Sequence, residues 1–269
     1  MKDISYDILE LLEKYGSDPE GIQKALESEK APEVLYALSP IRENLLEWYE
    51  WNPSGRLLQI GADYGALTGM LAEKLGEVSV WDVRDEDLEV VKRRCPEAEN
   101  IRLMKRAFLE DLPESSFDYI LIPEFRRDLM PEKGEEGIKA LFAGLKKLLK
   151  PGGSLLAAGF NRIGLRTFAG AESDQEAETL TWRLIREVSG ECLEGTEPKI
   201  YYPVPDHRLP VAIYSDHRLP AKGELPNLSM IYDWPGYRYF NEEAGFDRLL
   251  QEGQFSQFAD SYLVIWEKI

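Results

Sequence analysis

The chain has 269 residues, of which 43% are hydrophobic and 30% are charged, a composition typical of a globular protein with a sizeable core. The formal net charge of -17 argues against binding to nucleic acid or to an anionic membrane, because both partners require basic patches. We expect neither a signal peptide nor a membrane span, and Cys95 and Cys192 have no metal or redox spacing. These features together predict a cytoplasmic protein.

The first 54 residues predict a helical N-terminal cap. Apolar residues recur at helical spacing before Gly16, which ends the first run. Asp18 and Ser39 each precede a proline, the usual order of cap and first helical residue at a helix start. The residues that we expect on one face of the helix after Ser39 are Ile41, Leu45, Trp48 and Tyr49.

Short apolar runs then alternate with helical stretches. The expected strands cover residues 56–60, 78–82, 101–104, 118–122 and 154–160. Continuous apolar runs are typical of parallel strands that are buried on both faces. Their alternation with helices predicts an α/β fold with a Rossmann-like, doubly wound and mostly parallel sheet.

A glycine turn follows the first expected strand. Gly61 and Gly65 lie four residues apart, a helix follows them, and the second expected strand ends at Asp82. Such a turn lets the backbone approach a ligand, and an acid at the end of the second strand can accept both ribose hydroxyls. The pattern favours a nucleoside cofactor. The structural alternative is a tight turn and an Asp82 that caps the next helix.

Asp63 lies within this turn, and its charge indicates which kind of cofactor the turn binds. A carboxylate would repel a pyrophosphate by roughly 4 kcal/mol at about 4 Å and an effective dielectric constant of about 20. S-adenosylmethionine has no phosphate and carries an ammonium and a sulfonium group, so Asp63 favours it over a nicotinamide dinucleotide. Aspartate also adopts positive φ at modest cost.

Several motifs are similar to those of class I S-adenosylmethionine-dependent methyltransferases. They are "LLQIGADYGALTGMLAEKL", "VSVWDV", "FDYILIPE" and "LKKLLKPGGSLLAAG", and the closing "DSYLVIWEK" resembles the final antiparallel strand of that fold. The phrases "LSPIRENLLEW", "NRIGLRTFAGA" and "YYPVPDHRLPVAIYSDHRLP" resemble a bacterial subgroup associated with glycosyltransferases of cell-surface polysaccharide synthesis.

The resemblance implies a methyltransferase-like domain over residues 55–269, with an insertion at about 205–258 before the last strand. It also implies S-adenosylmethionine as cofactor, a saccharide or other small molecule as substrate, and a glycosyltransferase as partner. The residues that we expect to bind the cofactor are Arg42, Gln59, Gly61, Ala62, Asp63, Gly65, Asp82, Val83, Ala107 and Phe108.

Some of these positions depart from the family pattern. Gln59 stands where an acid usually receives the methionine ammonium, and Asp63 stands where the central glycine is usual. Arg106 and Ala107 replace a glycine and an Asp or Asn that touch adenine. The alternative function is therefore a non-catalytic, methyltransferase-like binding or interaction protein. A nicotinamide oxidoreductase is disfavoured by Asp63.

Three residues are candidates for catalysis: Glu124 and Asn161, which follow the fourth and fifth expected strands, and His207, which comes after the further expected strand "KIYYPV". They would lie at the carboxyl edge of the sheet, where an acceptor would bind. Asn161 is equally well interpreted as a cap of the following loop.

The phrase "DHRLP" occurs twice and contains both histidines, His207 and His217. A strand between them would separate them by roughly 33 Å, too far to share one metal. We therefore interpret the repeat as structural and expect no metal site.

Overall fold

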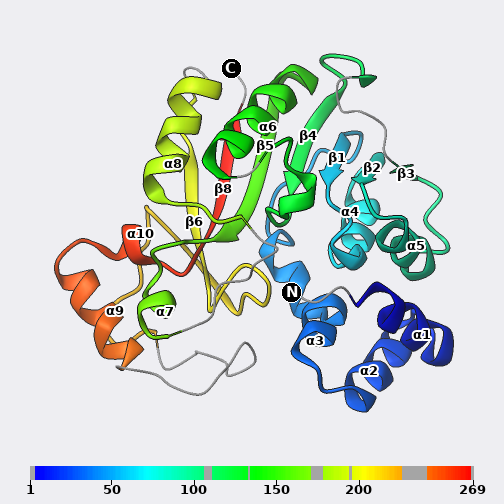
Figure 1. The fold of residues 1–269 in the computed structure, drawn as a ribbon, viewed down its shortest axis with the longest axis horizontal. Coiled ribbons are helices and arrows are strands. Elements are labelled where there is room, and N and C mark those ends of the chain that lie inside the picture. Colours follow the sequence, from blue (N-terminus) through cyan, green and yellow to red (C-terminus); the bar gives the residue numbers. More distant parts are fainter. Residues whose placement is uncertain are drawn as a thin grey trace.

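The computed structural model describes residues 4–105, 111–132, 134–170, 178–193, 196–225 and 241–267. They form a single sheet with helices on both faces (Figure 1). The strands are β1 (Arg56–Ile60), β2 (Glu77–Asp82), β3 (Ile101–Lys105), β4 (Phe117–Ile122), β5 (Leu149–Phe160), β6 (Lys199–Val204), β7 (Ala212–Ser215) and β8 (Ser261–Glu267). Within the described ranges, no helix has both the length and the apolar character needed to cross a bilayer.

Ten α-helices and four short turns are described. The helices are α1 (Ser5–Tyr15), α2 (Pro19–Ser28), α3 (Pro32–Leu38), α4 (Thr68–Lys74), α5 (Asp85–Arg94), α6 (Gly134–Leu148), α7 (Leu165–Phe168), α8 (Trp182–Glu187), α9 (Glu242–Gln251) and α10 (Phe255–Phe258). The 3-10 turns are η1 (Pro40–Leu45), η2 (Asp63–Gly65) and η4 (Arg127–Leu129), and η5 (Val188–Cys192) is a π-helical turn.

The strand order is β3-β2-β1-β4-β5-β8-β6-β7. The five strands from β3 to β5 in this order are parallel, and β8 runs antiparallel to both β5 and β6. The predicted α/β class and the final antiparallel strand are confirmed. The edge strand β7 is a second reversed strand, because it returns beside β6 as an antiparallel hairpin.

Alternate residues of the central strands face two different layers. Leu58, Ile120 and Leu155 pack with apolar residues of α6 and α8 in one cluster. Their sequence neighbours, such as Leu57 and Leu121, pack with α4 and α5 in the other. Burial on both faces explains the continuous apolar runs.

The strand order reverses between β1 and β4, which lie side by side although β2 and β3 come between them in the chain. Ligands of doubly wound sheets bind at such a switch point, beyond the carboxyl ends of the strands. The segments that follow β1, β2, β4, β5 and β6 are therefore the first place to look for a functional site.

The N-terminal helices pack beside the sheet, against α5 and η2 (Figure 1). The caps at Asp18 and Ser39 are as predicted, because their side chains accept from Gly21 N and Ile41 N. The helix expected after Ser39 is wrong in extent, since only a 3-10 turn forms. Its expected apolar face is also divided, with Leu45 buried and Trp48 43% exposed.

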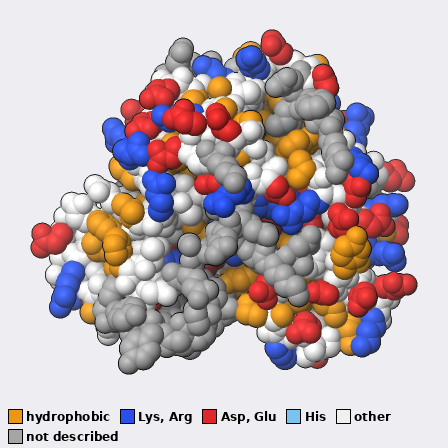
Figure 2. Space-filling view, viewed as in Figure 1, with side chains coloured by type: hydrophobic (Ala, Val, Ile, Leu, Met, Phe, Trp, Pro, Cys, Tyr) orange, Lys and Arg blue, Asp and Glu red, His pale blue; other side chains and the backbone are white. Residues whose placement is uncertain are grey.

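The surface shown in Figure 2 carries acidic and basic side chains interspersed, with apolar groups between them. Among the described residues visible on that face, no broad basic area is present. This distribution agrees with the net charge of -17.

Candidate active site

The turn after β1 has an unusual backbone. Gly61 has φ +91°, and Asp63, Tyr64 and Gly65 also have positive φ, at +47°, +52° and +72°. A Cβ atom at residue 61 would lie 2.8 Å from Leu129 Cδ1. The positive φ therefore favours glycine at residue 61, and the Leu129 side chain would have to shift to admit a larger residue.

Gln59 braces this turn from within. Its side chain is fully buried at the end of β1, and Nε2 donates to the carbonyls of Gly61 at 2.8 Å and Ala62 at 3.1 Å. Its Oε1 accepts from Thr68 Oγ1 at 3.1 Å. A carboxylate at this position could not donate to the two carbonyls, so Gln59 and the backbone of this loop form a matched set.

Asp82 ends β2 beside this turn and is fully buried. Its carboxylate accepts from Ala62 N at 2.7 Å and from Arg84 N at 2.9 Å. Arg126 donates to both of its oxygens, at 2.9 and 3.1 Å. The acid that we predicted to accept ribose hydroxyls is thus bound by an arginine of the same chain.

Arg126 was not predicted from the sequence, although "PEFRRD" places two arginines directly after β4. Its guanidinium also contacts Asp87 at 2.7 Å and Asp128 at 2.8 Å, and it is 16% exposed. Burial opposes its charge, but the three carboxylates outweigh burial and raise the pKa of Arg126.

Arg42 and Asp63, both predicted to bind the cofactor, contact each other as a buried ion pair. Burial raises the pKa of Asp63, and Arg42 opposes that shift. The Nε of Arg42 is buried and has no hydrogen-bond partner among the described residues. One donor at this end of the site therefore has no acceptor in the described part of the chain.

Glu124 follows β4 and binds Arg208, which lies in the loop after β6. Arg208 Nε is 3.1 Å from each carboxylate oxygen, and both side chains are buried. The guanidinium lies over the rings of Phe160, at 4.9 Å, and Tyr36, at 5.1 Å. The last residue of β5 and residues that follow β4 and β6 are therefore in direct contact at the carboxyl edge.

His207 is buried beside the same Phe160, with ring centroids 4.6 Å apart. Neither imidazole nitrogen has a hydrogen-bond partner within the described residues. Burial lowers the pKa of His207 well below 6.5; Asp206 opposes this shift, and three nearby arginines add to it. The imidazole is therefore neutral at neutral pH.

Asn161 uses its amide within the protein. Nδ2 donates to the carbonyls of Gln257 and Ala259, both at 2.8 Å, and Oδ1 accepts from Ile163 N at 3.1 Å. These contacts favour the capping interpretation, because they tie the end of β5 to the segment before β8.

Of the other residues singled out from the sequence, some lie within the part of the chain that the structure describes and some lie outside it. Ala62 is buried in the turn, and Val83 follows β2 and packs against the core. Ala107 and Phe108, together with Arg106, lie outside the described residues. His217 is exposed beyond β7, and the described residues contain no cluster of three or more His, Cys, Asp or Glu able to hold a metal.

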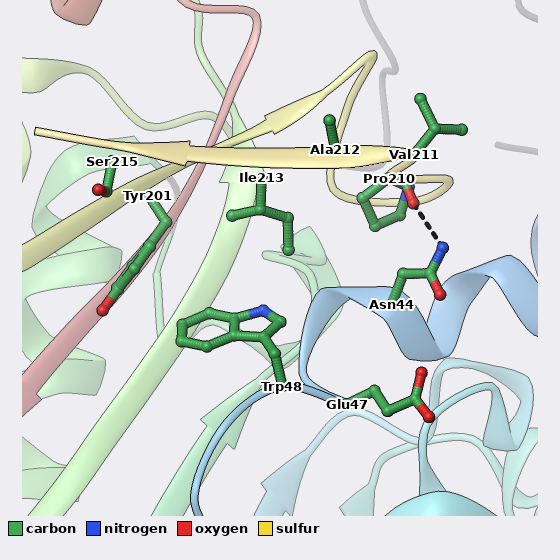
Figure 3. Close-up of a pocket in the computed structure, with 9 residues that line it drawn as sticks. All are labelled: Asn44, Glu47, Trp48, Tyr201, Pro210, Val211, Ala212, Ile213 and Ser215. Atoms are coloured by element: carbon green, nitrogen blue, oxygen red, sulfur yellow. Dashed lines mark hydrogen bonds between the residues drawn. The ribbon is translucent and has the colours of Figure 1, made fainter. Parts of the chain in front are cut away.

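A separate pocket of about 490 Å³ lies between the η1 region and the β6–β7 hairpin (Figure 3). Its lining residues are Asn44, Glu47, Trp48, Tyr201, Pro210, Val211, Ala212, Ile213 and Ser215. Asn44 Nδ2 donates to Pro210 O at 2.9 Å, and the Trp48 and Tyr201 ring centroids are 4.8 Å apart. None of the residues predicted to bind cofactor or to catalyse lines this pocket.

Comparisons with known proteins bear on the domain type and the fold of the chain. Residues 42–169 match the model of the methyltransferase small domain family. A comparison with curated protein sequences finds no match.

Solved structures provide a second comparison. The chain is similar to a SAM-dependent methyltransferase from Archaeoglobus fulgidus, with a TM-score of 0.55 and 15% identity over 87% of this chain and 94% of that one. It is also similar to geranyl diphosphate methyltransferase in complex with SAM, with a TM-score of 0.54 and 13% identity over 96% of this chain and 95% of that one. A third similar structure is phosphoethanolamine N-methyltransferase 1 from Haemonchus contortus, in complex with phosphoethanolamine and S-adenosylhomocysteine. Its TM-score is 0.52 and its identity 13%, over 98% of this chain and 48% of that one. At these identities the likeness establishes the fold, which is that of the SAM-dependent methyltransferases.

Proposed function

We propose that the chain is an S-adenosylmethionine-dependent methyltransferase that acts on a saccharide or another small molecule. The matched domain and the fold support S-adenosylmethionine as the cofactor. The observation that carries the proposal is the meeting, at one edge of the sheet, of the Gly61 turn, Asp82 and the group formed by Glu124, His207 and Arg208.

The residues at this edge fit the cofactor in two respects. An acid at the end of the second strand is placed to accept ribose hydroxyls in nucleoside-binding folds of this kind, and Asp82 holds that place. The buried Nε of Arg42 is a donor without an acceptor among the described residues, which a carboxylate such as that of the methionine moiety would satisfy.

The cofactor, when bound, supplies an electrophilic methyl group. The chain must then align the acceptor and remove its proton, and alignment contributes most of the acceleration in such a displacement. Of the three predicted catalytic residues, we assign proton removal to His207, because both of its ring nitrogens lack protein partners within the described residues. We assign Glu124 the role of positioning Arg208.

Titration calorimetry with S-adenosylhomocysteine tests the cofactor site. Wild type is expected to bind, and Asp82→Asn is expected to bind at least about tenfold more weakly, because a charged acceptor is lost. Asp111→Asn, a change to an exposed acid, is the matched control and should bind as wild type does. Equal affinity of all three proteins would place the ligand elsewhere.

Methyl transfer from labelled S-adenosylmethionine to a panel of saccharides and small hydroxyl or amine compounds tests the reaction. His207→Gln should lower the rate by about a hundredfold or more while leaving the affinity for S-adenosylhomocysteine unchanged. A variant that transfers methyl groups as fast as wild type would remove His207 from the mechanism.

A second candidate function is a non-catalytic binding or interaction protein. The observation that favours it is that Gln59, Asp63 and Asp82 are each bound by groups of the chain itself. The same calorimetry separates the two functions, since a non-catalytic protein with a drifted pocket would give no heat with millimolar S-adenosylhomocysteine.

The finer expectations rest on the resemblance of residues 38–48, 161–171 and 201–220 to the bacterial subgroup. We propose on that basis a cytoplasmic enzyme that works beside a glycosyltransferase. Co-purification of the chain with a glycosyltransferase encoded beside it would support this partner, and separate elution of the two proteins would count against it.

A further inference from the structure

The carboxylate of Asp82 has no free acceptor position. It receives four N–H groups, two from the backbone at Ala62 and Arg84 and two from the guanidinium of Arg126. A carboxylate offers about four lone-pair positions, so a ribose diol must displace at least one donor. The two backbone donors are fixed by the turn and by the start of α5, which leaves Arg126 as the exchangeable one.

The loop that carries Arg126 also covers the glycine turn. Leu129 is buried, and its Cδ1 lies 2.8 Å from where a Cβ of residue 61 would be. The segment 126–129 thus occupies both the acceptors of Asp82 and the space that Gly61 leaves open.

Arg126 can leave Asp82 without becoming unpaired. Its guanidinium already contacts Asp87 Oδ2 at 2.7 Å and Asp128 Oδ2 at 2.8 Å, and Nε contacts Asp128 Oδ1 at 3.1 Å. Asp87 receives a further hydrogen bond from Ser5 in α1, so this partner is held in place by a different element. An exchange of partners at Asp82 therefore costs less than the removal of a lone buried charge.

We propose that Arg126 occupies the ribose-binding carboxylate in the free protein and sets the affinity for nucleoside cofactors by competing for Asp82. A nucleoside diol replaces the two guanidinium donors on Asp82, and Arg126 keeps Asp87 and Asp128 as partners. The inference rests on the proposed function, because it assumes that the nucleoside ligand binds at Asp82.

Calorimetry with S-adenosylhomocysteine on five proteins tests the competition: wild type, Asp82→Asn, Arg126→Gln, Arg126→Lys and Arg127→Gln. Removal of the competing charge should tighten binding by about tenfold to a hundredfold in Arg126→Gln. The affinity of Arg126→Lys should lie between those of wild type and Arg126→Gln, since an ammonium pairs with one oxygen at a time. Arg127 is the matched control in the same loop, because its partner is Glu178 and its removal leaves Asp82 untouched. Thermal unfolding without ligand verifies that each variant is folded.

The outcomes separate this inference from the function on which it rests. Tighter binding by Arg126→Gln, including binding that appears only in this variant, supports the competition. Equal or weaker binding by Arg126→Gln, with wild type binding and Asp82→Asn impaired, overturns the competition and leaves the proposed function standing. No binding by any folded variant at millimolar ligand overturns both.

Discussion

Replacement of His207 by leucine is expected to stabilise the fold, because the wild-type imidazole is buried with neither nitrogen bonded among the described residues. A buried polar group without a partner costs about 1–3 kcal/mol. Leucine has a similar volume but loses the ring contact with Phe160, which contributes about 0.5–1.5 kcal/mol. The expected net gain in the free energy of unfolding is about 1 kcal/mol at pH 7.5, or roughly 2–4 °C in Tm.

The stability advantage of His207→Leu over the wild type should increase at acidic pH. Burial lowers the pKa of folded His207 well below 6.5, so below pH 6.5 the unfolded chain binds a proton that the folded chain does not. Stability of the wild type therefore falls as pH drops from about 6.5 toward the folded pKa, by at most about 1.4 kcal/mol for each pH unit. The leucine variant lacks this loss, so the difference in stability between the two proteins should be larger at pH 5.5 than at pH 7.5.

Urea unfolding, followed by tryptophan fluorescence at pH 7.5 and 5.5, measures both values. His217→Leu is the matched control, because it makes the same change in the same "DHRLP" phrase at an exposed position. It should alter stability by no more than about 0.5 kcal/mol at either pH. A His207→Leu protein that is less stable than wild type by over about 1 kcal/mol, with no widening in acid, would refute the reasoning.

Three further predictions concern the frame of the site. Gly61→Ala should destabilise the fold by about 1–3 kcal/mol, because residue 61 has a positive φ and its Cβ would contact Leu129. The control is Gly144→Ala in α6, whose Cβ meets no atom within 4 Å and which should stabilise the fold slightly. Thermal unfolding compares the two variants. Asn161→Ala should cost about 1–3 kcal/mol in urea unfolding, because a buried and a partly buried hydrogen bond to backbone carbonyls are both lost. A neutral result would contradict the capping role. Burial raises the pKa of Asp260 to about 7, so its folded form binds a proton more tightly than the unfolded chain and stability falls as pH rises from about 4 to 7. Asp260→Asn should therefore gain up to about 4 kcal/mol at pH 8, the free energy that separates an aspartate pKa of about 4 from one of about 7, and little at pH 4. Equal gains at both pH values would argue against a raised pKa.

The sequence alone determined most of the fold. The expected strand at residues 56–60 coincides with β1, and the other expected strands overlap β2 to β5, because strands buried on both faces must be apolar throughout. The helix predicted after Ser39 is wrong in length, because tertiary contacts decide the conformation of this segment. There the chain must bring Arg42 to Asp63 and Asn44 to Pro210, and a six-residue 3-10 turn does this where a longer helix was expected.

The sequence also selected the edge of the sheet where the candidate site lies. The glycine turn and the acid at the end of β2 are local patterns, and Gly61 and Asp82 do lie beside each other. Their partners could not be predicted, because Arg126 is 44 residues from Asp82 and Arg208 is 84 residues from Glu124. Only the packing of separate loops decides which arginine meets which acid.

The two copies of "DHRLP" separate local from tertiary information most directly. The five residues are identical, yet His207 is buried against Phe160 and His217 is exposed. Arg208 pairs with the buried Glu124, while Arg218 pairs at the surface with Glu224. The first copy follows a strand at the carboxyl edge and the second follows the edge strand β7, so neighbouring elements, and not the phrase itself, set burial and charge pairing.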